Sequence, residues 1–389
     1  MDEITAVADT AQNPSTEKDL ILVLNSGSSS LKFGVYFRGT SDEEALLTGS
    51  AGGIGRSTGE LHIRSADGKS LLQRDQVHES QIDALTALSG AMREHIQAAP
   101  VAVGHRVVHG GPKLCRHQRI TPEVLDELHA ATHFAPLHIP QALSLIKSAQ
   151  SIFPSAVHFA CFDDAFHRTI PQVASRFSIP AKYYDAGIRR YGFHGISYES
   201  LVHHFGSRLP PRAIFAHLGN GSSLCALRNG KSIDTTMGLT PTGGVPMGTR
   251  SGDLDPGVIL YLLRNEKLGA DELEQMLNHR SGLFALSSGQ SDVKILEERA
   301  GAKNDPKAAL ALDIFALAVR KTIGAYVALL GGIDLLVFTG GIGEHSSRIR
   351  SSAADGLESL GLPKEKIQAV PTEEERQIAR HCRILLNAR

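Results

Sequence analysis

Three short segments of the chain combine glycine with serine or threonine, and each follows a run of apolar residues. They are Asn25–Lys32, His217–Ser223 and Thr339–His345. Small residues let backbone N–H groups approach phosphate oxygens, hydroxyl groups add donors, and Lys32 adds a positive charge. Any one of these segments could be an ordinary turn. Three of them, each after a hydrophobic strand, favour a protein that binds the phosphates of a nucleotide.

The two commonest nucleotide-binding signatures are missing from the chain. The Walker A pattern GxxxxGK[ST] is absent, and so is a clean GxGxxG. A dinucleotide-binding fold would also need an acidic residue about 20 positions after its glycines. The phosphate site is therefore expected to be of another kind.

Charged and ionisable residues lie inside or at the ends of apolar runs. Arg106 interrupts an apolar strand, either as a structural ion pair or as a fork for a carboxylate or phosphoryl group. Asp163 and Asp164 end another apolar run, where an acid caps a turn, binds Mg²⁺ or positions an attacking oxygen. His194 and Arg250 lie in glycine-rich loops. A lone histidine is usually structural.

The elements that must position these groups alternate along the chain. Short apolar runs bounded by Gly or Ser predict strands at 20–27, 31–37, 102–111, 155–167 and within 212–227. Helical spacing predicts helices at 121–135, 305–330 and 372–386, the last beginning with a capping box of Thr372 and Glu375. Residues 333–346 are predicted to form a strand, a turn and a helix start. This alternation indicates an α/β protein with mixed sheets.

The pattern of strand, turn and strand occurs twice, about half a chain apart. N-S-G-S-S-S-L begins at Asn25, and N-G-S-S-L begins at Asn220. Internal repetition indicates two related domains, each presenting such a turn to one cleft. The repeated stretch is short, so a chance match is the alternative interpretation.

Composition limits the class of protein. The 389 residues carry a formal net charge of −1, which offers no basic excess for nucleic acid. No run of about 18 apolar residues predicts a membrane span. Residues 1–18 lack the basic start and apolar run of a secretion signal, so a disordered leader is expected. The four cysteines form no CxxC pair, which favours a reducing, cytoplasmic setting.

Taken together, the motifs resemble the acetate kinase family. From about Leu20 to the C-terminus the chain contains, in the family's order, LNSGSSSLKF, GHRVVHGG, APLH, FDDAFH, RRYGFHG, HLGNGSS, MGTRSGDLDP, FTGGIGE and PTEEE. The resemblance implies two duplicated domains like those of actin and ribonuclease H, with mixed sheets flanked by helices and an active-site cleft between them. It implies an N-terminal acid- and metal-binding domain (19–166 plus 372–389) and a C-terminal nucleotide-binding domain (167–371).

The resemblance also implies a reaction and its partners. The reaction is reversible transfer of the γ-phosphoryl group of ATP to acetate, giving acetyl phosphate and ADP, with Mg²⁺ or alternatively Mn²⁺. A homodimer is implied as well. A propionate or other short-chain acyl kinase is the nearest alternative, because one methylene is worth only about 1–3 kcal/mol in an apolar pocket. The distant alternative is a non-enzymatic, nucleotide-driven binding module such as actin, which would not need the four ionisable residues above.

Family roles carry over onto the matching residues. Asp163 would be the essential acid, which orients the acetate oxygen or acts through magnesium. Arg106 would hold the carboxylate or the phosphoryl group, while His194 and Arg250 would stabilise the transition state. The pocket for the methyl group would be formed by Val108, Leu137, Phe193 and Pro241.

The remaining roles concern the metal and the nucleotide. Asn25 and Glu374 match the family's metal-associated positions. The residues that match its ATP contacts are Lys32, His217, Leu218, Gly219, Asn220, Gly221, Asp292, Val293, Lys294, Gly341, Ile342, Gly343, Glu344 and His345.

Several positions depart from the family's usual residues. Asp164 stands where threonine is usual, and a second acid there would change the pKa of Asp163 or the metal geometry. Lys294 replaces an arginine and loses its planar fork of donors. Glu373 replaces an asparagine beside Glu374. We expect these changes to affect nucleotide affinity and fine specificity.

Overall fold

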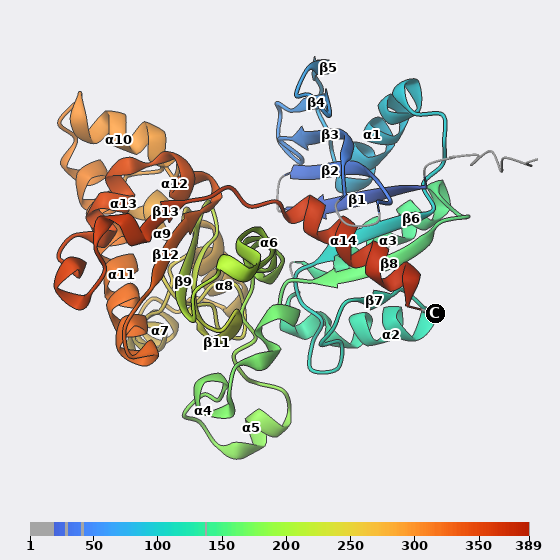
Figure 1. Cartoon of the computed structure of the whole chain (residues 1–389). Helices are drawn as coiled ribbons and strands as arrows, with labels where there is room; N and C mark the ends of the chain where they lie inside the picture. The colour runs from blue at the N-terminus through green and yellow to red at the C-terminus, as the bar shows by residue number, and fades with distance from the viewer. Residues whose placement is uncertain (1–18, 28–29, 40–42, 137, 389) are drawn as a thin grey trace, which may run out of the picture.

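The structure is a computed structural model that describes residues 19–27, 30–39, 43–136 and 138–388. The expected disordered leader, Leu137 and the serines at the tip of the first turn lie outside these ranges. Figure 1 shows two lobes, each built around one β-sheet. Among the described residues, no helix combines the length and apolarity that a membrane span requires.

The first lobe contains a mixed sheet of eight strands in the order β5-β4-β3-β2-β1-β6-β8-β7. Strands β1 to β5 are antiparallel to one another, β6 runs parallel to both β1 and β8, and β7 is antiparallel to β8. The strands are β1 (Leu20–Ser26), β2 (Ser30–Phe37), β3 (Ala45–Gly52), β4 (Glu60–Ser65), β5 (Ser70–Asp75), β6 (Ala102–Val107), β7 (Gln118–Arg119) and β8 (Val157–Phe162).

The second lobe contains a mixed sheet of five strands in the order β11-β10-β9-β12-β13. Strand β10 is antiparallel to β9 and β11, while β12 is parallel to β9 and β13. The strands are β9 (Arg212–Leu218), β10 (Ser222–Arg228), β11 (Lys231–Thr235), β12 (Leu335–Thr339) and β13 (Ile367–Ala369).

The two sheets repeat one topology. In the first sheet, β3-β2-β1-β6-β8 consists of three antiparallel strands followed by two parallel ones. The second sheet has the same order and directions, with β9 in the place of β1 and β12 in the place of β6. The turn after β1 therefore corresponds to the turn after β9, which confirms the duplication predicted from the two Asn-Gly-Ser segments.

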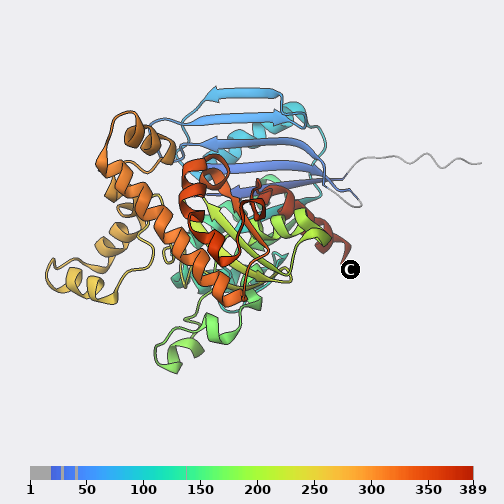
Figure 2. The same ribbon diagram turned by 60° about the vertical axis from the view of Figure 1, so that its left-hand side comes forward.

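Helices cover the outer face of each sheet. In the first lobe, α1 (Gln81–His95) and α3 (Ile139–Ile152) bury Leu85 and Leu145 against Leu22 and Phe33. In the second lobe, α11 (Pro306–Leu330) packs Phe315 and Val319 against the sheet, beside α10 (Val293–Gly301) and α13 (Ser347–Ala354). Figure 2 shows α11 as the long orange helix across this lobe.

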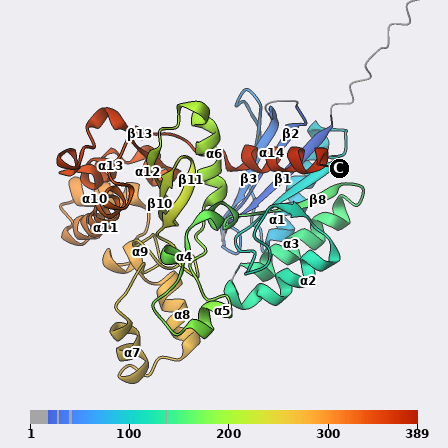
Figure 3. The same cartoon turned by 60° about the horizontal axis from the view of Figure 1, so that its bottom comes forward.

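Two further helices cover the inner faces, and they are exchanged between the halves of the chain. Helix α14 (Glu374–Asn387) follows the second sheet in sequence, but it packs Ile378 against Ile21 of the first sheet. Helix α6 (Gly195–Phe205) follows the first sheet and packs Leu201 against Phe215 of the second. The two helices lie side by side between the lobes (Figure 3).

The remaining described helices connect these layers. They are α2 (Pro122–Ala130), α4 (Gln172–Ser175), α5 (Ala181–Asp185), α7 (Pro256–Arg264), α8 (Ala270–His279), α9 (Gly282–Leu286) and α12 (Gly340–His345), with 3₁₀ turns at Ala131–Phe134, Ala165–Thr169, Gly206–Arg208, Leu357–Leu360 and Lys364–Lys366. The predicted strands 102–111 and 155–167 end earlier than expected, at Val107 and Phe162, because the chain leaves the sheet to form the site.

The predicted capping box of α14 is wrong. The N-cap is Glu373, and its side chain makes no capping hydrogen bond. The Thr372 hydroxyl lies 3.0 Å from the Ser200 hydroxyl, and Glu375 accepts a hydrogen bond from Asn25 at 2.7 Å. Tertiary contacts therefore use both side chains that local sequence assigned to the helix end.

Candidate active site

Two adjoining cavities lie where the lobes meet. The first has a volume of about 290 Å³ and the second about 440 Å³. Both are lined by Arg106 from the first sheet, by His194 at the start of α6, and by Asn220 and Gly221 from the turn after β9. The residues that the two cavities share place the predicted acid side and the predicted phosphate side next to each other.

Arg106 and Asp163 form the buried centre of the first cavity. Arg106 lies near the end of β6, and Asp163 directly follows the neighbouring parallel strand β8. Arg106 donates from Nε at 2.9 Å and from Nη2 at 2.6 Å to Oδ2 of Asp163. Because adjacent parallel strands end at one sheet edge, groups 57 residues apart become partners.

Asn25 extends this centre to α14. Its Oδ1 accepts a hydrogen bond from Arg106 Nη1 at 3.1 Å, and its Nδ2 donates to Glu374 at 2.9 Å and to Glu375 at 2.7 Å. Asn25 is nearly fully buried at the end of β1. The chain of contacts joins the first predicted turn, the buried arginine and the start of the last helix into one network.

Burial and charge set the protonation states in this network. Burial raises the pKa of Asp163 to about 6, against the opposing effect of Arg106. Burial also disfavours the charged form of Glu374, but Arg106, His217 and the Asn25 hydrogen bond outweigh it and lower the pKa of this carboxyl group. Both acids are therefore carboxylates at neutral pH, and they face a guanidinium that stays charged.

His194 is the N-cap residue of α6 and adopts a left-handed backbone with φ of 59°. The following Gly195 donates its N–H to the Asp163 carbonyl at 2.9 Å, and a Cβ on residue 195 would lie 2.1 Å from that oxygen. Only glycine permits this approach. The turn thereby fixes His194 directly beside Asp163.

The His194 ring is held neutral by its surroundings. Burial, followed by the nearby His217, Arg106 and Arg250, lowers its pKa well below the usual value. Nδ1 lies 2.9 Å from the Ser223 hydroxyl, which lies 2.5 Å from the Tyr198 hydroxyl. When Tyr198 donates to Ser223 and Ser223 to Nδ1, the ring proton remains on Nε2, the nitrogen that faces Gly221.

The opposite wall of the first cavity carries Arg250 and the apolar residues. Arg250 Nη1 donates to the Pro241 carbonyl at 3.2 Å, and burial followed by Arg106 lowers the pKa of Arg250. Val108 packs on a small buried cluster that includes Phe193. Val108, Phe193 and Pro241, three of the four predicted pocket residues, line the cavity. Leu137, the fourth, lies outside the described residues.

Seven of the predicted nucleotide-side residues line the second cavity, together with Asn25 and Glu374. They are Lys32, His217, Gly219, Asn220, Gly221, Gly341 and Glu344. The rings of His217 and His194 stack with centroids 4.2 Å apart, and Ser197 lies 2.8 Å from Nδ1 of His217. Burial lowers the pKa of His217 to about 4, so this face of the cavity is neutral and polar.

The other predicted nucleotide-side residues do not line either cavity. Leu218 and Val293 are buried in the second lobe's core. Asp292 caps α10 by accepting from the Ile295 N–H at 3.2 Å. Ile342, Gly343 and His345 lie on α12, and Gly343 is buried there. Lys294 is exposed on α10.

Two residues of the site were not predicted from the sequence. Glu375 binds Asn25 beside Glu374, although its place in a helical pattern indicated only a cap. His138 lines the first cavity, and burial followed by Arg250 and Arg106 lowers its pKa to about 4. His138 belongs to the APLH motif, so that motif was the available signal.

The departures from the family pattern face away from the cavities. Asp164 accepts the Gly110 N–H at 3.1 Å and lies 3.1 Å from His109, so it braces the loop after β6. Glu373 pairs with Arg376 at 2.9 Å on the surface of α14. None of the three departures, including Lys294, lines the described cavities.

Comparison with known proteins identifies this arrangement. The model of the acetokinase family matches residues 20–381. The chain belongs to the acetokinase family. It is therefore a phosphotransferase that acts on a carboxyl group, as the motifs implied, and the alternative of a non-enzymatic binding module is wrong.

Relatives agree over nearly the full length. An acetate kinase from Nitrobacter hamburgensis is 41% identical over 394 residues, covering 95% of this chain and 96% of the relative. The crystal structure of a Porphyromonas gingivalis acetate kinase has a TM-score of 0.83 at 31% identity and covers 95% of this chain and all of its own. The crystal structure of a Francisella tularensis propionate kinase has a TM-score of 0.86 at 35% identity. The match covers 94% of this chain and all of the propionate kinase chain.

Proposed function

We propose that this acetokinase transfers the γ-phosphoryl group of ATP directly to acetate, reversibly, giving acetyl phosphate and ADP. The observation that carries the proposal is the meeting of the two cavities. One offers two arginines and an apolar wall, which suits a small carboxylate. The other offers glycine-rich turns from β9 and β12, which suit a chain of phosphates. Arg106 and His194 stand where the two would meet.

The acid is bound already ionised. A carboxylic acid with an ordinary pKa near 4 is a carboxylate at pH 7, so the site needs no base to deprotonate it. Arg106 and Arg250 attract the carboxylate, and the methyl group packs against Val108, Phe193 and Pro241. Asp163 holds Arg106 in place through its paired hydrogen bonds, and so orients the attacking oxygen through the guanidinium of Arg106. Positioning, rather than proton transfer, is the work of these residues.

Charge that spreads over the transferring phosphoryl group is met by fixed donors. His194 presents an Nε2–H, and Arg250 and Arg106 present guanidinium groups on either side. Because these donors are held by Ser223, Pro241 and Asp163, little reorganisation is needed when the charge develops.

The residues present fit a magnesium ion. Mg²⁺ prefers oxygen ligands, and the carboxylates of Glu374 and Glu375 bring such oxygens to one edge of the second cavity, where the Asn25 amide holds both of them. Asp163 Oδ1 is buried without a partner among the described residues, as expected of an atom that waits for a ligand. We propose Asn25 and Glu374 as the holding residues. Bound there, Mg²⁺ or Mn²⁺ would neutralise phosphate charge.

Trapping with hydroxylamine tests the function. The full-length protein is incubated with ATP, MgCl₂ and acetate, and acyl hydroxamate is measured. We expect hydroxamate that depends on all three additions. A folded protein that forms no hydroxamate with any short acid would overturn the proposal.

Propionate is the second candidate acceptor. The likeness to a propionate kinase at a TM-score of 0.86 favours this alternative, and the apolar wall discriminates one methylene only weakly. Running the same assay with acetate, propionate and butyrate, and comparing kcat/KM for each, ranks the acids. We expect acetate to lead.

We also propose that the protein acts as a homodimer. Helix α7 has no buried side chain, yet its sequence is PGVILYLLR. Leu260 and Tyr261 are 45% and 55% exposed, an apolar face that a second copy would cover. Light scattering should give twice the chain mass, and Tyr261→Glu should shift it toward one chain mass. A monomeric wild-type protein would contradict this proposal.

We also propose a division of the chain into two domains and a location in the cell. The division into an acid- and metal-binding domain (19–166 plus 372–389) and a nucleotide-binding domain (167–371) is supported by the packing of α14 on the first sheet. A cytoplasmic location is supported by the use of ATP.

A further inference from the structure

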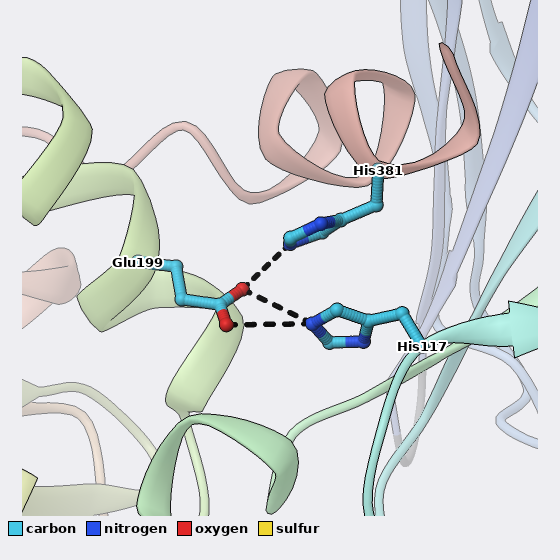
Figure 4. A group of neighbouring side chains, drawn as sticks. All are labelled: His117, Glu199 and His381. Carbon is cyan, nitrogen blue, oxygen red and sulfur yellow. Dashed lines mark hydrogen bonds and ion pairs between the residues drawn. The ribbon is translucent and has the colours of Figure 1, made fainter. Parts of the chain in front are cut away.

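A largely buried cluster of one carboxylate and two imidazoles joins α6 to α14, outside the linings of the two cavities (Figure 4). Glu199 Oε2 lies 2.6 Å from Nε2 of His381, and each Glu199 oxygen lies 3.3 Å from Nε2 of His117. The two imidazole rings face each other with centroids 3.9 Å apart. The side chains are 18% exposed for Glu199, 15% for His381 and 13% for His117.

The three residues come from both lobes. Glu199 projects from α6, whose Leu201 and Tyr198 pack on the second sheet. His381 projects from α14, which packs on the first sheet, and His117 precedes strand β7 of that sheet. The cluster therefore ties the inner helix of one lobe to the inner helix and edge of the other.

Two histidines and a glutamate are also a donor set for a metal ion, and these ligand atoms all lie within 4.8 Å of one another. The hydrogen bonding opposes that assignment. Nδ1 of His117 accepts the Phe162 N–H at 3.0 Å, so Nδ1 carries no proton and the ring proton lies on Nε2, where it points at Glu199. Burial opposes protonation of His117, but the hydrogen bond to Glu199 and its charge outweigh burial and raise the pKa of His117, so the proton on Nε2 is held in place. A metal-binding histidine shows the reverse pattern, with Nδ1–H donating and Nε2 deprotonated.

The acceptor at the centre is a carboxylate. Burial disfavours the charged form of Glu199, but the hydrogen bonds from His117 and His381 outweigh burial and lower its pKa. Charge-assisted hydrogen bonds of this kind are the stronger ones in proteins, and here they are shielded from water. The cluster is thus a firm connection between helices rather than an exposed ion pair.

Both helices begin at the active site. Glu199 lies five residues after His194, the N-cap of α6, and His381 lies seven residues after Glu374, the first residue of α14. At 1.5 Å per residue these spans are roughly 8 and 10 Å along rigid helices. A shift of either helix at the cluster is therefore transmitted to His194 or to the contact between Asn25 and Glu374.

We propose that Glu199 is a positioning residue for phosphoryl transfer, which, with His117 and His381, locks α6 to α14 and so fixes His194 relative to Glu374. This inference rests on the proposed function. It adds to that function three residues that touch neither cavity among the described lining residues.

Steady-state kinetics of Glu199→Gln test the lock. The amide keeps one acceptor but presents N–H groups to the second imidazole, so the cluster opens. We expect kcat to fall about tenfold, with both KM values changed less than about threefold, because misplaced groups impair the transition state more than binding. His381→Ala should behave alike, whereas His381→Gln, which can still donate to Glu199, should recover most of kcat.

A matched control and a coupling measurement separate positioning from general destabilisation. Asp334→Asn makes the same chemical change at the ion pair with Arg212, whose closest contact is 2.6 Å, beyond the far end of β12 from Thr339. Its kcat should stay within twofold of wild type. In the Glu199→Gln background, His194→Ala should reduce kcat by a smaller factor than in wild type, since His194 is already displaced.

Several outcomes would overturn the lock. Folded Glu199→Gln with wild-type kcat, or effects of the two substitutions that simply multiply, would do so. One equivalent of Zn²⁺ bound by wild type and lost in Glu199→Gln would make the cluster a metal site instead. If wild type forms no acyl phosphate, the proposed function fails separately. In that case, amide hydrogen exchange tests the lock. Glu199→Gln must increase the exchange rates of backbone amides in the first turns of α6 and α14, and unchanged rates would overturn the lock.

Discussion

Arg106 places two of its N–H groups on a single oxygen of Asp163, at 2.9 Å and 2.6 Å, and leaves the other oxygen without a partner among the described residues. The unpartnered Oδ1 is buried beside the first cavity. A buried polar atom without a partner is unfavourable unless a ligand completes it. The pair is therefore arranged for an interaction that exists only when substrates are bound.

Asp163→Asn tests this pair. The substitution keeps the shape of the side chain but removes the charge that faces Arg106, so we expect kcat to fall by at least about 100-fold. Breaking a buried ion pair also destabilises the fold, by about 3–5 kcal/mol, so the Tm should fall. The hydroxamate assay and a thermal melt measure both effects. Activity within threefold of wild type would remove Asp163 from the mechanism.

Arg250→Ala separates rate from stability. Apart from a long contact to a sulfur atom, the hydrogen bond that Arg250 makes is to the Pro241 carbonyl at 3.2 Å, so its loss should hardly change the Tm. An arginine that stabilises a transferring phosphoryl group contributes roughly 10³–10⁵ in rate. We expect kcat to fall within that range. Arg38→Ala, at an ion pair with Asp19, is the control. A near-normal kcat for Arg250→Ala would contradict its assigned role.

Val108→Ala enlarges the apolar wall. Val108 packs on the cluster that contains Phe193, so truncation leaves room for one more carbon. We expect the ratio of kcat/KM for propionate to that for acetate to rise about five- to tenfold, the lower end of the effect of one methylene. The assay is the hydroxamate panel with both acids. An unchanged ratio would show that the acyl chain lies elsewhere.

Buried histidines make the fold sensitive to acid. Burial lowers the pKa of His105 to about 3 and of His138, His167 and His217 to about 4. In the unfolded chain these groups take up protons near pH 6.5, so below that pH the unfolded state binds more protons and stability falls. Each contributes about 1.4 kcal/mol per pH unit until its folded pKa is reached.

Thermal melts across this window check the linkage. The Tm should fall steeply as the pH is lowered from about 6.5 to 4. His105→Gln removes one of the four groups, so the decline of its Tm below pH 6.5 should be shallower than that of wild type. A Tm that is flat from pH 7 to 5 would contradict the buried, neutral state of these rings.

Local pattern was sufficient for much of the fold. The strands before Asn25 and Asn220 were predicted because short apolar runs end sharply at Gly and Ser. The long helix 305–330 was predicted from its helical spacing, and it forms as Pro306–Leu330 with Asp305 as its cap. The repeated turns correctly indicated duplication, since the two sheets share one strand order.

Long-range contacts explain the features that the sequence did not predict correctly. Glu375 was assigned to a capping box, but Asn25, 350 residues away, binds it instead. In the cluster of Glu199, His117 and His381, the Glu199–His381 contact joins residues 182 positions apart, and no motif spacing marks it. Helix α14 returns to the first sheet only because the chain crosses between lobes twice, a fact that periodicity does not contain.

Phosphorus NMR of the working enzyme tests the central claim most directly. The protein is mixed with ATP, MgCl₂ and acetate, and the phosphorus signals are followed over time. Direct transfer predicts an acyl phosphate signal that grows with ADP in a ratio of one to one, and that is absent without acetate. ADP and inorganic phosphate that appear from the outset with no acyl phosphate would show that the chain hydrolyses ATP without phosphorylating the acid, which would contradict the proposed reaction.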